Sequence, residues 1–438
     1  MGSLVLALFA IGLTPARAVP AFAVQTGQAC QACHVGGFGP QLTNFGREFK
    51  LRGYTMRTNA FNLPVSVMAV ASYLRTAKDQ PAPPAPDFRT NDNAALDQVS
   101  LFFAGGLGSH LGAFVQTTYD GVAKAWTWDN LDVRATTTAQ FKGADMVLGV
   151  SLNNNPAVQD AWNTLPAWGY PYTSSALAPS PSASPLLAGA LAQNTLGVTA
   201  YAWINNKFMI EGGAYGSPGA NALARLGADP LSPGDIDGLA PYARLAYQQA
   251  LGAGTLEVGA FGMRADIHPG RDRSTGLTDR FTDLGVDASY ERTLQNSDVV
   301  TANARYIHEH QSLNATCALA GQMTDCASND LSDIRADVSY YWRNEIGATV
   351  AVFDTFGSAN PTIYAANRTL KPDSTGMTFQ LDGTPFGGGS PIGLRFNMRV
   401  GVQYTLYTRF DGARSNFDGA GANASDNNTL RVFTWFAY

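Results

Sequence analysis

Apolar and polar residues alternate along much of this chain. Between Leu63 and Tyr73 the odd-numbered positions are all apolar or aromatic. Around residue 334 the even-numbered positions carry apolar and aromatic side chains, whereas the odd-numbered positions are mainly polar or charged. The same alternation starts again at Leu394 and continues to Leu406. A period of two over ten or more residues predicts β-strands with one apolar and one polar face.

Two kinds of protein use such strands. A soluble sandwich buries the apolar face, whereas an outer-membrane barrel turns that face toward lipid and keeps polar residues inside. Several polar-face positions carry charge, namely Asp333, Arg335, Asp337, Arg343, Arg395 and Arg399. These charges suit a wet lumen, so the alternation favours the barrel.

The predicted connections between strands fall into two length classes. Short turns are expected at residues 107–109, 141–143, 205–207, 295–297 and 343–345. Long polar or Pro-rich loops are expected at residues 77–94, 153–192, 217–239, 266–280, 311–330, 357–373 and 411–427. Short turns at one end and long loops at the other are typical of outer-membrane barrels. We therefore expect an all-β transmembrane barrel of about sixteen antiparallel strands.

The last residues of the chain agree with a closed barrel. Alternation runs from Leu430 to an aromatic residue, Tyr438. This ending resembles the terminal signal of barrel proteins, which more often end in Phe. A closed barrel leaves no edge strand over, and a chain that ends within its last strand fits such closure.

Composition supports the same picture. Hydrophobic residues make up 45% of the chain, charged residues only 14%, and glycine occurs 45 times. The apolar residues are spread out singly, and none of the later segments has the run of about 20 that a transmembrane helix needs. The net charge of −5 leaves no basic footprint for nucleic acid.

The first residues resemble a secretory signal. An apolar run from Leu4 to Leu13 precedes Ala16-Arg17-Ala18, a small-x-small cleavage site. The run is too short for a membrane anchor, which needs about 20 apolar residues. The usual basic residues before the run are missing. We expect residues 1–18 to be a signal peptide and the chain to be exported to the outer membrane of a Gram-negative cell.

One short stretch carries specific chemistry. Cys30-Gln31-Ala32-Cys33-His34 has the Cys-x-x-Cys-His pattern of covalent c-type haem attachment. The two thiols can add to the vinyl groups of one porphyrin, and the adjacent histidine can bind the iron as proximal ligand. A thioredoxin-like pair would need a βαβ context, and a zinc site would need a second pair of ligands. Neither surrounds residue 30, so the motif predicts one covalently bound haem c.

The haem segment is expected to span residues 19–62, before a barrel of residues 63–438. After the motif, Gly36 to Pro40 can bend the backbone, and Leu42, Phe45 and Phe49 recur at helical spacing up to Gly53. The candidate contacts to the haem are Phe38, Phe45 and Arg47. The cations Arg47, Lys50 and Arg52 either lie near the propionates or form an ordinary solvated face.

The haem segment is too short to bury a haem by itself. About 40 residues are too few to support a core of their own, so the rest of the chain must cover the haem.

The remaining cysteines are Cys317 and Cys326, which flank a loop-like stretch. In an exported protein a disulfide across that loop is the expected arrangement, because the loop offers no partners for a second metal site. His308 and His310 share one strand face near its outer end. They are candidates for contact with iron ions outside the cell, although solvated rim histidines are the commoner case.

At both termini the chain resembles the outer-membrane cytochrome–porin fusions, the monohaem proteins of iron-oxidising bacteria. The N-terminal likeness lies in residues 26–29, 44–50 and 53–55, and the C-terminal likeness in residues 385–386, 401–405 and 423–430. The resemblance implies a small c-type haem domain fused to a barrel, with Cys30 and Cys33 as thioether sites and His34 as proximal ligand. It also implies electron transfer from extracellular Fe(II) to a soluble periplasmic cytochrome or similar carrier, rather than hydrolytic or group-transfer catalysis.

One haem cannot span an apolar layer of about 30 Å. We therefore expect the haem segment to lie in the barrel lumen, where the barrel would also cover the haem. Otherwise a partner protein must reach into the barrel from the periplasm. A diffusion porin whose haem segment is a plug or redox-sensing gate is the main alternative. A haem peroxidase would need an open distal position and an acid–base pair, for which no motif argues.

The sixth iron ligand has three candidates. Met56, which lies near the end of the haem segment, is the first choice because a thioether raises the reduction potential relative to a second histidine. Met68, with lumen-facing parity on the first strand, and His110, at a predicted periplasmic turn, are the alternatives.

Overall fold

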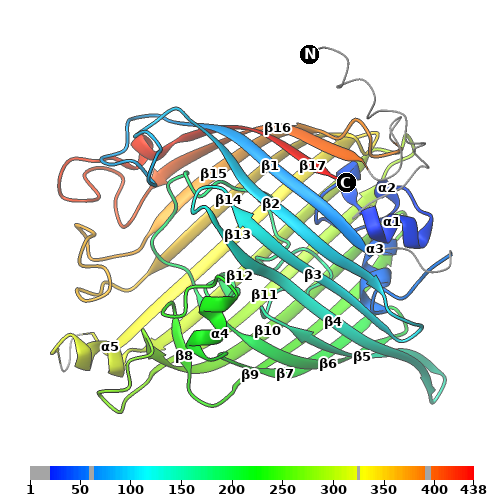
Figure 1. Ribbon diagram of the computed structural model, residues 1–438, viewed down its shortest axis with the longest axis horizontal. Coiled ribbons are helices and arrows are strands. Elements are labelled where there is room, and N and C mark those ends of the chain that lie inside the picture. The colour runs from blue at the N-terminus through cyan, green and yellow to red at the C-terminus, as the bar shows by residue number, and fades with distance from the viewer. Residues whose placement is uncertain (1–19, 59–63, 323–325, 390–395) are drawn as a thin grey trace, which may run out of the picture.

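Antiparallel strands close into a single cylinder. The computed structural model describes residues 20–58, 64–322, 326–389 and 396–438. Strand β1 (Val65–Thr76) pairs along one edge with β2 (Asn93–Gly106) and along the other with β17 (Thr429–Ala437), which closes the barrel. Among the described residues there are seventeen strands, and sixteen complete the circuit because β8 (Gly234–Ile236) pairs only with the end of β10. The predicted barrel of about sixteen strands is confirmed (Figure 1).

The other barrel strands follow in chain order around the circuit. They are β3 (Leu111–Asp120), β4 (Ala125–Phe141), β5 (Ala144–Asn153), β6 (Leu196–Ile204), β7 (Phe208–Gly216), β9 (Ala240–Leu251), β10 (Gly254–Pro269), β11 (Asp279–Thr293), β12 (Val299–Ser312), β13 (Ser328–Trp342), β14 (Ile346–Gly357), β15 (Ser374–Gly383) and β16 (Asn397–Arg409). Short helices lie outside the strands: α1 (Pro20–Thr26), α2 (Cys30–Cys33), η1 (Val35–Gly37), α3 (Asn44–Leu51), η2 (Leu186–Ala188), α4 (Ala220–Arg225), α5 (Asn314–Leu319) and η3 (Ala424–Asn427).

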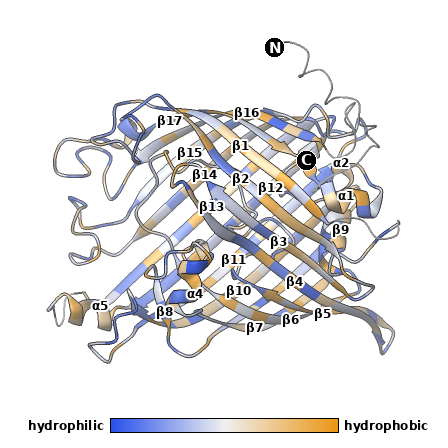
Figure 2. Ribbon diagram, in the orientation of Figure 1, coloured by the Kyte–Doolittle hydropathy of each residue, from blue (hydrophilic) through white to orange (hydrophobic). Residues whose placement is uncertain are grey.

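The two faces of the barrel wall have inverted polarity. Outward side chains are apolar and exposed, as Val338 at 57% and Leu381 at 66% show. Inward side chains include arginines that are almost fully buried, such as Arg134 and Arg399. Figure 2 shows this alternation of hydrophobic and hydrophilic residues along the strands. A soluble protein would bury the apolar face, so the protein is an outer-membrane barrel with a polar lumen.

The connections divide as expected. Turns of a few residues join β4 to β5 and β6 to β7, whereas long segments such as residues 154–195 and 358–373 lie at the other end. The loop expected at 266–280 is shorter, because β10 and β11 extend into it and leave residues 270–278. Helices α1 to α3 gather at the short-turn end, and α5 lies at the opposite end (Figure 1). By the usual orientation the short turns are periplasmic and the long loops extracellular.

Some expectations concern residues outside the described part of the chain. They are the signal peptide at residues 1–18, the start of the barrel at Leu63, and the polar-face position Arg395. Among the described residues, no helix has both the length and the apolar composition needed to cross a membrane.

Candidate haem site

The Cys-x-x-Cys-His motif forms one short turn of helix followed by a sharp bend. Helix α2 ends at Cys33, and the backbone then turns through Gly36 and Gly37, which have φ values of 70° and 71°. A Cβ at Gly36 would lie 2.5 Å from the Tyr341 ring of the barrel wall, so only glycine allows this approach. The bend is fixed by the Gly36 N–H, which donates to Asn344 Oδ1 at 2.6 Å.

Helix α3 packs directly against the motif. It begins after Thr43, whose hydroxyl accepts the Gly46 N–H at 3.3 Å. A Cβ at Gly46 would lie 2.3 Å from the Cys33 carbonyl oxygen, so this glycine sets the distance between α3 and the motif. The helix ends before Gly53, which has a φ of 68°.

The barrel wall holds this segment inside the periplasmic mouth. Arg47 forms an ion pair with Glu291 of β11 at 3.0 Å, with both side chains largely buried. Tyr201 of β6 donates to the Leu51 carbonyl at 2.6 Å, and Arg399 of β16 donates to the Phe38 carbonyl at 2.8 Å. These contacts come from strands on different sides of the barrel, so the segment lies in the lumen, as expected.

A long loop reaches the segment from the opposite side. Residues 154–195, between β5 and β6, enter the lumen and are largely buried over residues 154–165. Asn163 of this inward loop donates to the Pro40 carbonyl at 2.7 Å and accepts the Leu42 N–H at 2.9 Å. The inward loop therefore covers the haem segment from within the barrel.

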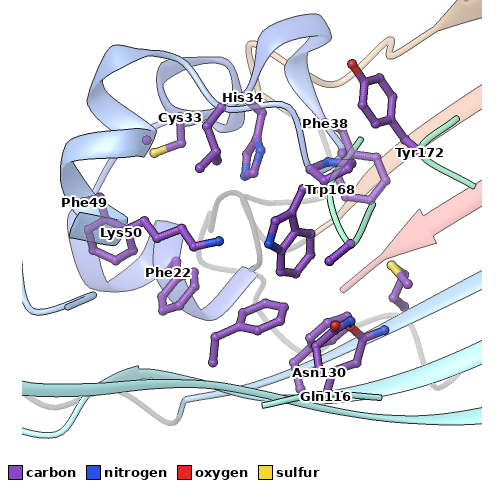
Figure 3. Close-up of a pocket in the computed structure, with 18 of the residues that line it drawn as sticks. Phe22, Cys33, His34, Phe38, Phe49, Lys50, Gln116, Asn130, Trp168 and Tyr172 are labelled. Carbon is purple, nitrogen blue, oxygen red and sulfur yellow. The ribbon is translucent and has the colours of Figure 1, made fainter. Parts of the chain in front are cut away.

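A cavity of about 310 Å³ lies between the haem segment, the inward loop and the barrel wall. Most of its wall is aromatic or apolar, and a few polar groups are gathered on β2 to β4. Its main lining residues are Phe22, Cys33, His34, Phe38, Phe49, Lys50, Tyr54, Met68, Phe102, Phe114, Gln116, Asp129, Asn130, Trp168, Tyr172 and Trp435. Figure 3 shows His34, Cys33 and Lys50 around the same space, with Trp168 facing them. An apolar wall with a few convergent polar groups is the usual form of a cofactor site.

Burial controls the chemistry of the motif. It lowers the pKa of His34 to about 4, an effect partly opposed by the carbonyls of Gln41 and Gly39. The imidazole is therefore neutral at physiological pH, the state in which it can bind a metal. Burial, with the nearby Cys30 thiol, raises the pKa of Cys33 to about 12, so this thiol is protonated.

Lys50 lies in the wall of the cavity, where it meets the inward loop. Its ammonium donates to the carbonyls of Val158 and Asp160 at 2.7 and 2.6 Å and lies 4.6 Å from the Trp168 ring centroid. Burial and the charge of Arg134 lower the pKa of Lys50 to about 7. Of the cations Arg47, Lys50 and Arg52, only Lys50 lines the cavity.

The residues selected from the sequence are not all brought together. Cys33, His34, Phe38 and Met68 line the cavity, and Cys30 is buried one helical turn before Cys33. The other selected residues lie outside the wall; they are Phe45, Arg47, Met56 and His110.

Each of those residues has another setting. Arg47 is neutralised by Glu291. Phe45 is half-buried on α3 and does not line the cavity, whereas Phe49 of the same helix does. Met56 packs against the buried aromatic cluster that includes Phe49 and Phe114 without lining the cavity, and His110 lies in the β2–β3 turn with Nδ1 3.0 Å from the Thr136 carbonyl.

The side chains present fit a haem. Nδ1 of His34 is buried and has no hydrogen-bond partner of regular geometry among the described residues, although the carbonyls of Gln41 and Gly39 are close enough to affect the ring. Two buried thiols precede it at the spacing that haem attachment needs. Cys30 and Cys33 would hold the porphyrin edge, His34 would reach the iron, and the aromatic wall would exclude water.

Trp168 and Tyr172 are wall residues that the sequence analysis did not select. They belong to the segment that was expected to be an outer loop. The sequence does contain a sign that this segment is buried, because a solvated loop rarely carries so many large aromatic residues. They are Trp162, Trp168, Tyr170 and Tyr172.

Two other predicted sites lie toward the extracellular end. Cys317 and Cys326 form a disulfide with their Cα atoms 5.8 Å apart. His308 and His310 project outward beside Asp330, with His310 Nδ1 2.8 Å from a carboxylate oxygen. Among the described residues, no group of three or more histidine, cysteine or acidic side chains is placed to hold a metal ion.

Comparison with known proteins gave structural likenesses only. No family model and no curated protein matches the chain. Among solved structures, OmpF of Salmonella typhi in complex with daunomycin is similar at 12% identity and a TM-score of 0.47, covering 87% of this chain and 100% of that one. An anion-selective porin from Comamonas acidovorans is similar at 10% identity and a TM-score of 0.47, covering 85% and 98%. OmpT of Vibrio cholerae is similar at 10% identity and a TM-score of 0.45, covering 85% and 98%.

Proposed function

We propose that this protein is an outer-membrane c-type cytochrome that moves electrons across the membrane, as the outer-membrane cytochrome–porin fusions that it resembles are expected to do. Haem bound at the cavity would supply a one-electron carrier. The donor would be extracellular Fe(II), which loses one electron to become Fe(III), and the acceptor a soluble periplasmic carrier such as a c-type cytochrome.

The observation that carries this proposal is the position of His34. Its ring and the Cys33 thiol share one buried aromatic cavity inside a barrel that crosses the outer membrane. The wall is mainly aromatic and apolar, and the hydrogen bonds from Tyr201 to Leu51 and from Arg399 to Phe38 attach the segment around the motif to the barrel. The protein would need little reorganisation on gaining or losing an electron, because the cavity is fixed on several sides.

The proposal is tested with purified protein in sealed proteoliposomes. Fe(II) added outside is expected to produce the absorption bands of ferrous haem, and a Cys30→Ala, Cys33→Ala double variant should show neither covalent haem nor the response. If haem is attached and is reduced by dithionite but not by Fe(II) from either side, then Fe(II) is not the donor.

A diffusion porin with a haem-containing plug or redox gate is the second candidate. The porin-like barrel favours it, and in that case the haem segment and the inward loop would be a movable plug rather than a fixed mount. Liposome swelling separates the two functions. Swelling by small sugars, with a rate that depends on whether the haem is oxidised, would support the gate and contradict a fixed mount.

A further inference from the structure

Lys50 is a buried cation whose ammonium contacts no carboxylate. Its two hydrogen bonds go to neutral carbonyls, and among the described residues no acidic oxygen lies within 4.0 Å of its nitrogen. The charged groups that act on it from farther away are Asp132 and Arg134 of β4, Glu211 of β7 and Asp160 of the inward loop. Asp132 and Arg134 are paired with each other at 2.8 Å. Burial of an ion without a partner is strongly unfavourable, so a lysine in this position needs an explanation.

The location of this cation is as unusual as its lack of a partner. The side chain crosses from α3 toward the inward loop, and its end lies in the wall that also holds His34 (Figure 3). A cation at this place acts on any charge inside the cavity through a medium of low dielectric. The same cation on the outer side of α3 would be screened by water, as Arg52 is beside Glu48.

Tethering the inward loop does not by itself explain a lysine here. Asn163 already ties the same loop to the same segment through two neutral hydrogen bonds, to Pro40 and Leu42. A glutamine at position 50 could also donate to loop carbonyls without placing a charge in the interior. The feature that only a cation supplies is the positive potential in the cavity.

We propose that Lys50 raises the reduction potential of a haem held by His34, by placing a positive charge in the wall of the haem cavity. This inference rests on the proposed function. Ferric haem carries one more positive charge than ferrous haem, so a nearby ammonium disfavours the ferric state and draws the one-electron equilibrium toward reduction. A unit charge within roughly 10 Å at an effective dielectric of about 20 changes such an equilibrium by about tenfold or more.

Spectroelectrochemical titration of the detergent-purified full-length holoprotein tests this directly. At about pH 6, where the Lys50 ammonium is charged, the variants Lys50→Met and Lys50→Gln should both lower the potential, by about tenfold in the reduction equilibrium constant. Lys50→Arg, which keeps the charge, should stay near the wild-type value. Using two neutral variants guards against the case in which one of them fails to fold.

Matched controls separate charge from structure. Asn163→Ala breaks the neutral tether between the loop and the segment, and Arg52→Met removes a partly exposed cation at the C-cap of the same helix. Neither should lower the potential as Lys50→Gln does. An Asn163→Ala variant that falls as far would show that loop displacement is the cause and would overturn the inference. A holoprotein of Lys50→Gln with an unchanged potential would also overturn it.

The outcomes distinguish a failure of the Lys50 inference from a failure of the proposed electron-transfer function. Wild-type protein without covalent haem would contradict the proposed function itself. Haem that is reduced by Fe(II) in wild type and keeps its potential in both neutral variants would leave that function standing and remove only the role of Lys50.

Discussion

At the scale of single residues, the cavity wall bears on the candidates for the sixth iron ligand, among which the sequence placed Met56 first and Met68 as an alternative. Met56 and Met68 are both thioethers close to the haem segment, and the chain order gave no reason to prefer the second. Met68 is on the inward side of β1, is only 8% exposed and lines the cavity, whereas Met56 does not line it. Because Met68 lines the cavity and Met56 does not, we propose Met68, the alternative named from the sequence, ahead of Met56 as the sixth ligand.

Replacing these methionines gives a direct prediction. In Met68→Ala the Soret and α-bands of the haem should shift and its potential should fall, because a thioether ligand favours ferrous iron. Met56→Ala should leave both unchanged. Absorption spectra of the two purified variants, recorded in both redox states, decide between them, and the opposite assignment of effects would restore Met56.

At the scale of elements, the inward loop is held to the barrel by buried charge. Arg244 of β9 lies 3.6 Å from Asp160 of the loop and also pairs with Glu257 of β10 at 3.3 Å and Asp287 of β11 at 2.5 Å. Thr164 of the loop donates to Asp287 as well. One arginine thus joins three strands to the segment that covers the candidate haem cavity.

Removing this arginine should be costly. Arg244→Met leaves three buried carboxylates without their cation and should destabilise the folded barrel by about 3–5 kcal/mol, the range for breaking a buried ion pair. The exposed Arg273, which pairs with Asp235 at 2.6 Å, provides the control. Arg273→Met should cost less than about 1 kcal/mol. Reversible urea unfolding in lipid vesicles measures both, and equal effects would show that the lumen is more hydrated than its packing indicates.

At the scale of the whole molecule, the barrel wall is built for a lipid environment on its outer side. Outward residues such as Val338 and Val350 of neighbouring strands are exposed at 57% and 45%, and they would face water in a soluble protein. In a bilayer this surface is in contact with acyl chains, and the lumen takes the charges.

A charge on the outer face tests this arrangement. Val338→Lys should destabilise the barrel in vesicles by about 2–4 kcal/mol if the residue lies near the bilayer midplane. The same change at an exposed position of a soluble protein would fall within about 0.5 kcal/mol. Unfolding titrations of the variant and of Val338→Ile, an apolar control, measure the difference, and a negligible cost for lysine would place this face outside the membrane.

The sequence by itself determined the barrel, and it located the Cys-x-x-Cys-His motif from which a haem is predicted. Strand alternation of the kind seen at residues 334–342 fixes which side chains face inward, because a period of two leaves no other choice once one face is apolar. The number of strands followed from the connections, and the five-residue motif followed from local chemistry alone. These features depend on residues that are close together in the chain, so they can be predicted from the sequence.

Only the tertiary structure decided which residues surround the motif. The inward course of residues 154–195, the ion pair that removes Arg47 from the cavity, and the burial of Lys50 all depend on contacts between residues more than a hundred positions apart. Local sequence patterns do not encode such contacts. An amphipathic helix with cations on one face has the same sequence pattern whether those cations contact water, a carboxylate or a carbonyl. The closed barrel brings these partners together, and that closure decides which of them each cation meets.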